Sequence, residues 1–345
     1  MQTRRRTARF ALVAAPVAAA ITLATTLVPA GDAYAPQSDR GAYSVGEVTE
    51  TWTDGARNRS LPVRIYYPME RHEGCPVILF SHGLGGTRNG CRYLGLHWAS
   101  HGYVSIHVQH PGSDDAVWRG KANPHMEMQK AARDLGNLIH RPKDITFAID
   151  RLPALQQADG PLKGMLDLGR IGVGGHSFGA YTTQVIVGMR LIAPTGFEAK
   201  GLADGRVRAA LILSPTPTGN SDPETVFGSI RVPCLHMTGT EDRSLVVDTP
   251  PEHRRIPFDH IQLSDQALVI LNGAGHLAFS DRRVRDGREP AHHNAIRAAS
   301  LAFWDATLAG RADARRWLYG DGLATHLRGA ATVETKTADA QPTAK

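Results

Sequence analysis

Short runs of apolar residues, each about the length of one strand, recur along the chain between segments of mixed polarity. They lie at residues 76–81, 103–108, 171–174, 207–213, 232–237 and 267–271. An uninterrupted apolar run of this length is typical of a strand that is buried on both faces, as in a parallel sheet. The pattern therefore predicts a mostly parallel central sheet.

The segments between these runs contain candidate helices, at residues 92–100, 141–152, 180–189 and 291–308. Ahead of all of them, residues 44–53 and 60–67 have the pattern of two strands joined by a turn, which predicts an antiparallel N-terminal edge. Alternation of strands with helices indicates the α/β class, with a central sheet that is flanked by helices. We find no internal repeat.

The first 35 residues have the composition of a signal peptide. Four arginines within residues 4–9 precede an apolar stretch over residues 10–28, and Ala33-Tyr34-Ala35 has the form of a cleavage site. Because Pro16 interrupts a stretch that is only mildly apolar, we expect a cleaved signal rather than a retained membrane anchor. The protein is then exported, to the periplasm or the medium, with no stable membrane span after cleavage. The arginine run leaves both the general secretory and the twin-arginine route open.

One large α/β domain is expected to follow over residues 36–322, and an Ala/Thr-rich tail over residues 323–345 is expected to be disordered. Loss of four arginines and one aspartate with the signal segment reduces the net charge of the chain from +6 to +3. No basic face with interleaved aromatic residues is evident, so nucleic acid is not an expected partner.

Three cysteines allow at most one internal disulfide. Cys75 and Cys91 flank one strand and loop and could pair in an exported protein. Cys234 lies in an apolar run, where a cysteine usually behaves as a small buried hydrophobic residue.

The first motif that carries chemistry is Gly175-His176-Ser177-Phe178-Gly179, at the end of the 171–174 run. This G-x-S-x-G pattern is typical of a nucleophile elbow, where a serine on a strained strand-to-helix turn projects its hydroxyl from the sheet. The Phe178 N–H would begin the next helix, where unpaired amides stabilise a developing oxyanion. The alternative for the motif by itself is a Gly-rich turn of any α/β protein.

A histidine and an acid follow later strands in the order that this site requires. His276 comes five residues after the 267–271 run, within N-G-A-G-H, and it would take the Ser177 proton. Asp242 ends the segment G-T-E-D after the 232–237 run, and it would orient His276. Glu241 is the local competitor for the role of the acid. Either carboxylate could instead be a solvated loop residue, and His276 a surface histidine.

The second oxyanion donor is expected from the loop that follows the 76–81 run. This loop reads H-G-L-G-G over residues 82–86, and the Leu84 backbone N–H is the expected donor beside that of Phe178. His82 is expected to bond the loop backbone. The alternative for this loop is a flexible turn.

Other polar clusters give weaker signals. His107, His110, Asp114 and Asp115 fit no closed set of metal ligands, so we predict no metal at these residues. Trp118, Met126 and Met128 could line an acyl pocket, pack in the core or form a surface flap. His176, inside the elbow motif, is expected to be a packing neighbour.

Five motifs together resemble the α/β-hydrolase superfamily, and within it the platelet-activating factor acetylhydrolase and predicted dienelactone hydrolase-like group. They are F-S-H-G-L-G-G at 80–86, A-S-H-G-Y-V at 99–104, H-P-G-S-D at 110–114, R-P-K-D-I at 141–145 and G-H-S-F-G at 175–179. The resemblance implies an α/β-hydrolase fold and a serine esterase without metal or organic cofactor. One position departs from the acetylhydrolases, in which the acid follows the strand after the elbow helix. Here Ser214 stands there, and the later G-T-E-D is similar to bacterial cutinases and polyester hydrolases.

These observations predict a serine carboxylic-ester hydrolase. The connection from Leu213 to Val232 is short, so we expect no large lid domain and an open site. An open site suits short-acyl, acetyl or phospholipid-like esters, and it also suits a polymer surface, so a cutinase or polyester hydrolase is the main alternative. A dienelactone hydrolase, a peptidase and a non-catalytic binding protein on this scaffold are weaker alternatives. The natural ester and the oligomeric state stay open.

Overall fold

The computed structural model describes residues 34–36, 38–192, 195–218, 221–244, 246–281 and 289–338. Apart from Tyr34 and Ala35, the predicted signal peptide lies outside these residues. In the described part of the chain, no helix is long and apolar enough to cross a membrane.

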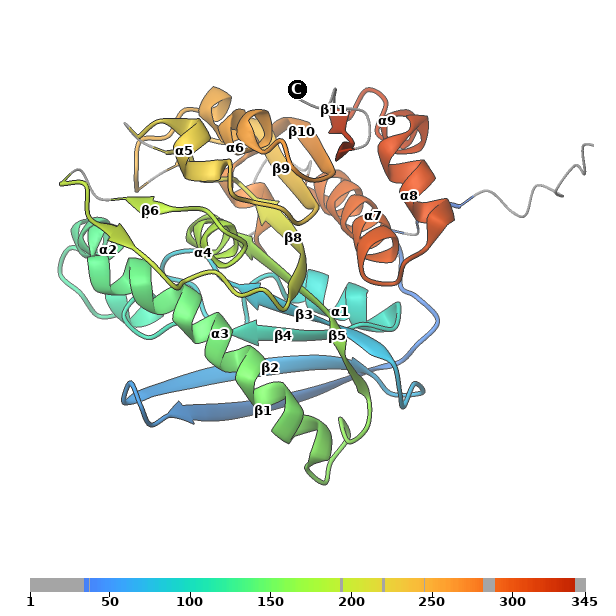
Figure 1. The fold of residues 1–345 in the computed structure, drawn as a ribbon, viewed down its shortest axis with the longest axis horizontal. Coiled ribbons are helices and arrows are strands. Elements are labelled where there is room, and N and C mark those ends of the chain that lie inside the picture. The colour runs from blue at the N-terminus through green and yellow to red at the C-terminus, as the bar shows by residue number, and fades with distance from the viewer. Residues whose placement is uncertain are drawn as a thin grey trace, which may run out of the picture. The chain divides into compact units, whose positions relative to one another are not determined.

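A nine-stranded sheet, in the order β1-β2-β4-β3-β5-β8-β9-β10-β11, forms the centre of the described chain (Figure 1). Its strands are β1 (Val45–Asp54), β2 (Arg59–Pro68), β3 (Cys75–Ser81), β4 (Val104–Val108), β5 (Leu166–His176), β8 (Val207–Leu213), β9 (Cys234–Glu241), β10 (Gln266–Gly275) and β11 (Ala331–Lys336). Neighbouring strands from β4 to β10 are parallel, whereas β1, β2 and β11 join the sheet through antiparallel pairs. The predicted mostly parallel sheet with an antiparallel N-terminal edge is confirmed. A separate short ribbon pairs β6 (Leu191–Ile192) with β7 (Glu198–Ala199).

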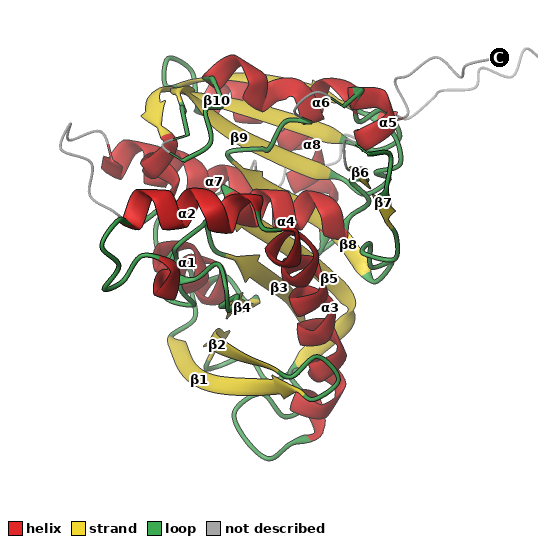
Figure 2. Ribbon diagram, turned by 90° about the vertical axis from the view of Figure 1, so that its left-hand side faces the viewer, coloured by secondary structure: helices red, strands yellow, loops and turns green. Residues whose placement is uncertain are grey.

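Helices cover both faces of this sheet, as Figures 1 and 2 show. The helices are α1 (Arg92–Ser100), α2 (Pro124–Arg133), α3 (Leu135–Gln157), α4 (Phe178–Ile186), α5 (Pro223–Phe227), α6 (Ile256–His260), α7 (Glu289–Thr307), α8 (Ala312–Tyr319) and α9 (Asp321–His326). The core residues of α3 and α4 pack in one cluster, and those of α1 and α7 pack in the other.

The two clusters explain why the central strands are mostly apolar on both faces. In β3, Val77 and Leu79 point into the cluster under α3 and α4, whereas Ile78 and Phe80 point into the cluster under α1 and α7. Successive side chains of a strand face opposite sides of the sheet, so a strand that is covered on both sides needs an unbroken apolar run.

The predicted disordered tail is wrong for residues 323–338. There α9 packs on the core, and β11 pairs with β10 from Gln266 to Leu271. Without β11, the edge of β10 would leave backbone groups unpaired, and the backbone of β11 pairs with them. The ammonium of Lys336 also donates a hydrogen bond to the carbonyl oxygen of Ile261 at 3.1 Å. The domain therefore continues beyond residue 322.

The suggested pairing of Cys75 with Cys91 is also wrong, because both thiols are free and buried. Cys75 belongs to the cluster under α3 and α4, and Cys91 belongs to the cluster under α1 and α7, so the sheet separates them. Cys234 is free and fully buried, as the sequence predicted.

Candidate active site

Ser177 stands on a strained turn between β5 and α4. Its backbone angles are φ 57° and ψ −114°, which L-residues rarely adopt. A Cβ on Gly175 would lie 2.3 Å from the carbonyl oxygen of Gly179, and one on Gly179 would lie 1.8 Å from that of Ser81. Only glycine fits at these two positions, so local sterics build the elbow that the G-x-S-x-G pattern predicts. The Ser177 side chain is half-buried and reaches solvent.

The structure brings Ser177, His276 and Asp242 together at the carboxyl ends of β5, β10 and β9. The His276 Nε2 lies 2.8 Å from Ser177 Oγ, and its Nδ1 lies 2.7 Å from Asp242 Oδ1. The ring therefore connects the hydroxyl to the carboxylate through two hydrogen bonds. If Nδ1–H donates to the carboxylate, Nε2 is free to accept the Ser177 proton.

Asp242 is fully buried, whereas the neighbouring Glu241 is exposed. Burial alone would raise the pKa of the Asp242 carboxyl. The hydrogen bond from His276 and the charge of the Arg254 guanidinium oppose this and hold its pKa at about 2. Thr238 Oγ1 donates to Asp242 Oδ2 at 2.8 Å, and the Arg254 Nε lies 3.7 Å from Oδ1. Asp242 is thus ionised and fixed in orientation, whereas Glu241 makes no contact with His276.

Two backbone amides are available to an oxyanion beside Ser177. Among the described residues, neither the Leu84 N–H nor the Phe178 N–H donates a hydrogen bond. Phe178 is the first residue of α4, where the amides have no partner within the helix. Gly85, next to Leu84, has φ +71° and donates its N–H to the carbonyl oxygen of Ser113 at 2.9 Å. The loop is therefore held by backbone bonds rather than flexible.

Two further histidines, His82 and His176, hold the main chain near Ser177 and His276 through hydrogen bonds. His82 Nε2 accepts the backbone N–H of His110 at 3.0 Å, so its Nδ1 carries the proton and donates to the carbonyl oxygen of Gly83 at 2.6 Å. His176 Nε2 donates to the carbonyl oxygen of His276 at 3.0 Å, and burial lowers the pKa of His176 to about 3. His176 is therefore a neutral neighbour that fixes the main chain of His276, a contact that the motif did not reveal.

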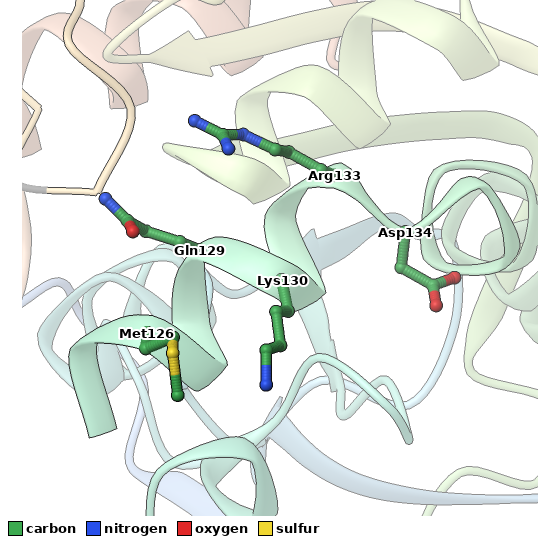
Figure 3. Close-up of a pocket in the computed structure, with 5 residues that line it drawn as sticks. All are labelled: Met126, Gln129, Lys130, Arg133 and Asp134. Atoms are coloured by element: carbon green, nitrogen blue, oxygen red, sulfur yellow. The ribbon is translucent and has the colours of Figure 1, made fainter. Parts of the chain in front are cut away.

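The segment after β4 contains α2, for which the sequence predicted no helix. Trp118 Nε1 donates to the carbonyl oxygen of Gly85 at 2.8 Å, and Met128 also lies next to Gly85. Both residues therefore border the 82–86 loop, whereas Met126 is exposed. A hollow along α2 is lined by Met126, Gln129, Lys130, Arg133 and Asp134 (Figure 3). Ser177 is not among the lining residues, so this hollow is not the reaction centre.

The histidines and aspartates that were weighed as metal ligands have other partners. His107 Nδ1 bonds to the carbonyl oxygen of Gly90, and His110 Nδ1 bonds to Asp144 Oδ2. Asp114 Oδ2 accepts from Gln109, and Asp115 pairs with Arg119. Within the described ranges, no group of three or more His, Cys, Asp or Glu side chains could hold a metal ion.

Sequence reasoning missed the supports of the acid. Thr238 and Arg254 both contact Asp242, and Arg254 comes from the 3-10 turn Pro251–Arg255, for which the sequence predicted no element. The position of Thr238, four residues before Asp242 on β9, could have suggested its contact. No local signal marks Arg254, because only the folded chain brings it to Asp242.

These features together define the α/β-hydrolase fold. The sheet is mostly parallel and is covered by helices on both faces. A serine stands on a strand-to-helix elbow, and a histidine and an acid follow later strands. Comparisons with known proteins agree. Residues 68–133 match the family model described as platelet-activating factor acetylhydrolase, isoform II.

Two groups of relatives are similar to this chain. A platelet-activating factor acetylhydrolase of Cavia porcellus is 25% identical over 258 residues, which cover 66% of this chain and 53% of the relative. Cutinase est2 of Thermobifida alba is 25% identical over 216 residues, which cover 62% of this chain and 56% of the relative. The chain thus spans about half the length of these curated relatives, and it resembles α/β-hydrolase esterases of both kinds.

Proposed function

We propose that this protein is a serine hydrolase of carboxylic esters that works through an acyl-enzyme. The observation that carries the proposal is the pair of hydrogen bonds, 2.8 Å and 2.7 Å long, that joins Ser177 Oγ through His276 to Asp242. The resemblance to acetylhydrolases and a cutinase supports an ester as the substrate.

In the first half-reaction, His276 Nε2 takes the Ser177 proton while Oγ bonds to the ester carbonyl carbon. The carbonyl electron pair moves to oxygen, and the Leu84 and Phe178 amides stabilise the oxyanion. Collapse of this intermediate breaks the bond to the alcohol oxygen, which leaves with the proton held by His276. Asp242 stays ionised and stabilises the imidazolium.

In the second half-reaction, water attacks the acyl group on Ser177. His276 takes a proton from the water and returns it to Ser177 Oγ as the acid leaves. Each half-reaction needs the same two amides and the same ring, so no further group is required.

We propose short-acyl, acetyl or phospholipid-like esters as the substrates, and an exported location for the enzyme. The half-exposed Ser177 and the short connection between β8 and β9 support an open site. The N-terminal sequence pattern supports export.

The test of the mechanism is Ser177→Ala, assayed on p-nitrophenyl acetate. Loss of the nucleophile should lower kcat by about 10⁴-fold or more. Undiminished turnover by the purified, folded variant would contradict the proposed mechanism.

A cutinase or polyester hydrolase is the second candidate, because the acid follows β9, as the resemblance to cutinases implies, and because Cutinase est2 is similar over much of the chain. Three substrates separate the candidates: a p-nitrophenyl acyl series, an sn-2 acetyl phospholipid and a polyester film. Release of soluble products from the film at a rate comparable with the small esters would favour the polyester hydrolase. Activity confined to the short or phospholipid esters would favour the acetylhydrolase type.

A further inference from the structure

Arg141 lies in α3 and is fully buried, yet it is a charged residue outside the triad. It begins the R-P-K-D-I motif, which the proposed mechanism does not use. Burial lowers the pKa of the Arg141 guanidinium to about 9, so it is still a cation at neutral pH. A buried charge is costly unless it is hydrogen-bonded and balanced, so its partners indicate what it does.

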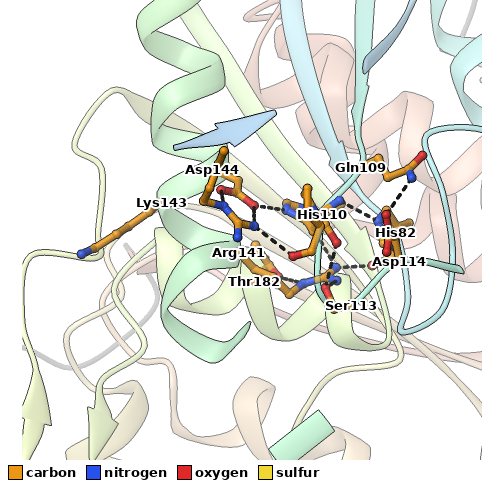
Figure 4. Close-up of polar contacts among 12 residues, drawn as sticks. His82, Gln109, His110, Ser113, Asp114, Arg141, Lys143, Asp144 and Thr182 are labelled. Atoms are coloured by element: carbon orange, nitrogen blue, oxygen red, sulfur yellow. Dashed lines mark hydrogen bonds and ion pairs between the residues drawn. The ribbon is translucent and has the colours of Figure 1, made fainter. Parts of the chain in front are cut away.

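The partners of Arg141 lie on the separate segments that build the oxyanion hole (Figure 4). On the loop side, the Arg141 Nη2 donates to the carbonyl oxygen of His82 and also to Ser81 Oγ, the latter at 3.0 Å. The Arg141 Nη1 donates to Ser113 Oγ at 2.8 Å. Ser113 in turn holds Gly85 through its carbonyl oxygen.

On the helix side, Arg141 Nε donates to Thr182 Oγ1 at 2.9 Å, and the Thr182 hydroxyl donates to the carbonyl oxygen of Phe178, also at 2.9 Å. The guanidinium carbon lies 4.5 Å from the centre of the Phe178 ring. One planar group therefore links the segment that carries the Leu84 amide to the segment that carries the Phe178 amide.

A buried row of side chains holds the guanidinium in place. Ser81 Oγ lies 3.0 Å from His110 Nε2, and His110 Nδ1 lies 3.1 Å from Asp144 Oδ2. Asp144 also accepts from Arg57 and Arg59, at 2.8 Å for the shortest contact of each. Burial would raise the pKa of Asp144, but its hydrogen bond from His110 and the nearby charges hold it at about 2, so Asp144 is ionised and its negative charge acts on the buried guanidinium of Arg141.

This row repeats the Ser–His–Asp pattern of the site, but it is not a second reaction centre. Ser81, His110 and Asp144 are all fully buried, so no ester reaches them. Ser81 Oγ also already accepts a hydrogen bond from Arg141. The row is therefore a support for the guanidinium.

We propose that Arg141 is a positioning residue that sets the separation of the Leu84 and Phe178 amides, and that Ser81, His110 and Asp144 orient it for this purpose. The inference rests on the proposed ester hydrolysis. An oxyanion hole stabilises the tetrahedral intermediate more than the bound ester, so a change in its geometry acts on kcat and leaves KM nearly unchanged.

The test uses Arg141→Met, Arg141→Lys and Thr182→Val, with kcat expressed per site titrated by a fluorophosphonate. Arg141→Met should lower kcat on p-nitrophenyl acetate by about 10²-fold, with KM within about threefold, since one lost oxyanion donor has an effect of that size. The Ki of a trifluoromethyl ketone, which forms a tetrahedral adduct on the serine, should rise by a similar factor. Arg141→Lys should show an intermediate loss of kcat, because the single nitrogen of an ammonium cannot reach all the partners that the three guanidinium nitrogens contact.

Two variants are matched controls. Lys143→Met removes a cation from the same helix, where the Lys143 side chain points away from the cluster in Figure 4. Tyr103→Phe removes a buried hydrogen bond to Asp305 in another part of the core. Both should leave kcat, KM and Ki unchanged.

A purely structural role of Arg141 would lower the titrated fraction and the unfolding midpoint but leave kcat per titrated site and Ki unchanged, and this result would overturn the inference. If Arg141→Met does not fold, Thr182→Val decides: it removes one charge-assisted bond, and kcat should fall by about tenfold with the same rise in Ki. Unchanged kcat and Ki in Thr182→Val would then overturn the inference.

Failure of the inference can be distinguished from failure of the proposed function. If the wild-type protein does not hydrolyse esters, the proposed function itself fails. If the wild type is active and Arg141→Met has an unchanged kcat and Ki, only the role of Arg141 is refuted.

Discussion

Glu241 and Asp242 are adjacent carboxylates at the end of β9, yet only Asp242 contacts His276. Asp242 turns inward because its backbone N–H bonds to the carbonyl oxygen of Gly239 and because Thr238 and Arg254 fix its side chain. Glu241 stays in solvent. At the scale of single residues, the assignment of the acid therefore depends on the turn after Gly239.

Asp242→Asn should lower kcat on p-nitrophenyl acetate by about 10⁴-fold, because an amide cannot hold the tautomer of His276 that accepts the Ser177 proton. Glu241→Gln should change kcat by less than about twofold, since exposed side chains away from the reacting atoms contribute little. Steady-state kinetics of both variants check this assignment. An equal loss in the two would show that Asp242 is not the acid.

Ser214 lies at a strand end next to the one that carries Asp242, the proposed acid. Ser214 follows β8, whose Leu213 pairs with Met237 on β9, so the ends of the two strands are neighbours. Ser214 is buried, with φ 57°, and its hydroxyl has no hydrogen-bond partner among the described residues. A carboxylate at the end of either strand lies near the same histidine, which is why the departure at Ser214 is compatible with an intact site.

At the scale of elements, the elbow is sterically closed around Ser177. Gly179→Ala should destabilise the fold by about 3 kcal/mol and lower kcat by at least about 10²-fold, because a backbone clash at Ser81 displaces both the nucleophile and the oxyanion loop. Gly205→Ala is the matched control, since a Cβ there would meet no atom within 4 Å. Urea unfolding and kinetics check both variants. An active, stable Gly179→Ala protein would refute the steric account.

The C-terminal strand β11 is an edge element that closes the sheet. Deletion of residues 331–345 should lower the thermal midpoint by about 5–10 °C, because it exposes the edge of β10 and removes the contacts of Lys336 and the Arg255–Glu334 ion pair. Deletion of residues 340–345 alone, which leaves all of β11 in place, is the matched truncation. Differential scanning calorimetry of the two truncations compares them. A common midpoint would contradict a structural role for β11.

At the scale of the whole molecule, the core contains many neutral histidines. Burial lowers the pKa of His97 and His176 to about 3 and that of His107, His110 and His236 to about 4. In the unfolded chain each would bind a proton near pH 6.5, so between pH 6.5 and 4 the unfolded state holds more protons. The contribution of these histidines to the free energy of unfolding is therefore fully present above pH 6.5, and it is lost as the pH decreases below that value.

Each histidine contributes a slope of up to about 1.4 kcal/mol per pH unit, so the urea midpoint should fall steeply from pH 7 to pH 5. Asp144 and Asp242, whose pKa values are held at about 2, add a further loss as the pH falls from about 4 towards 2. Circular dichroism in urea at several pH values measures the trend. The variant His97→Gln should reduce the slope, and an equal midpoint at pH 7 and pH 5 would contradict the account.

Much of the fold was predictable because its signals are local. Both faces of the central strands are covered, so β3, β4, β8 and β9 appear in the sequence as mostly apolar runs. The elbow motif occupies five residues: a Cβ on Gly175 would clash with Gly179 inside the motif, and one on Gly179 would clash with Ser81 at the end of the neighbouring strand β3. The order of Ser177, Asp242 and His276 followed from the rule that sites of such sheets gather at the carboxyl ends of strands.

The sequence by itself therefore determined the sheet, the elbow and the candidate triad, because each depends on neighbours in the chain or on strand order. Only the tertiary structure decided which carboxylate faces His276, how β11 covers β10 and why the two cysteines stay apart. It also decided the place of Arg141, whose partners at Ser81, Ser113 and Thr182 come from three separate segments. Contacts between distant segments depend on packing, and no short stretch of sequence specifies them.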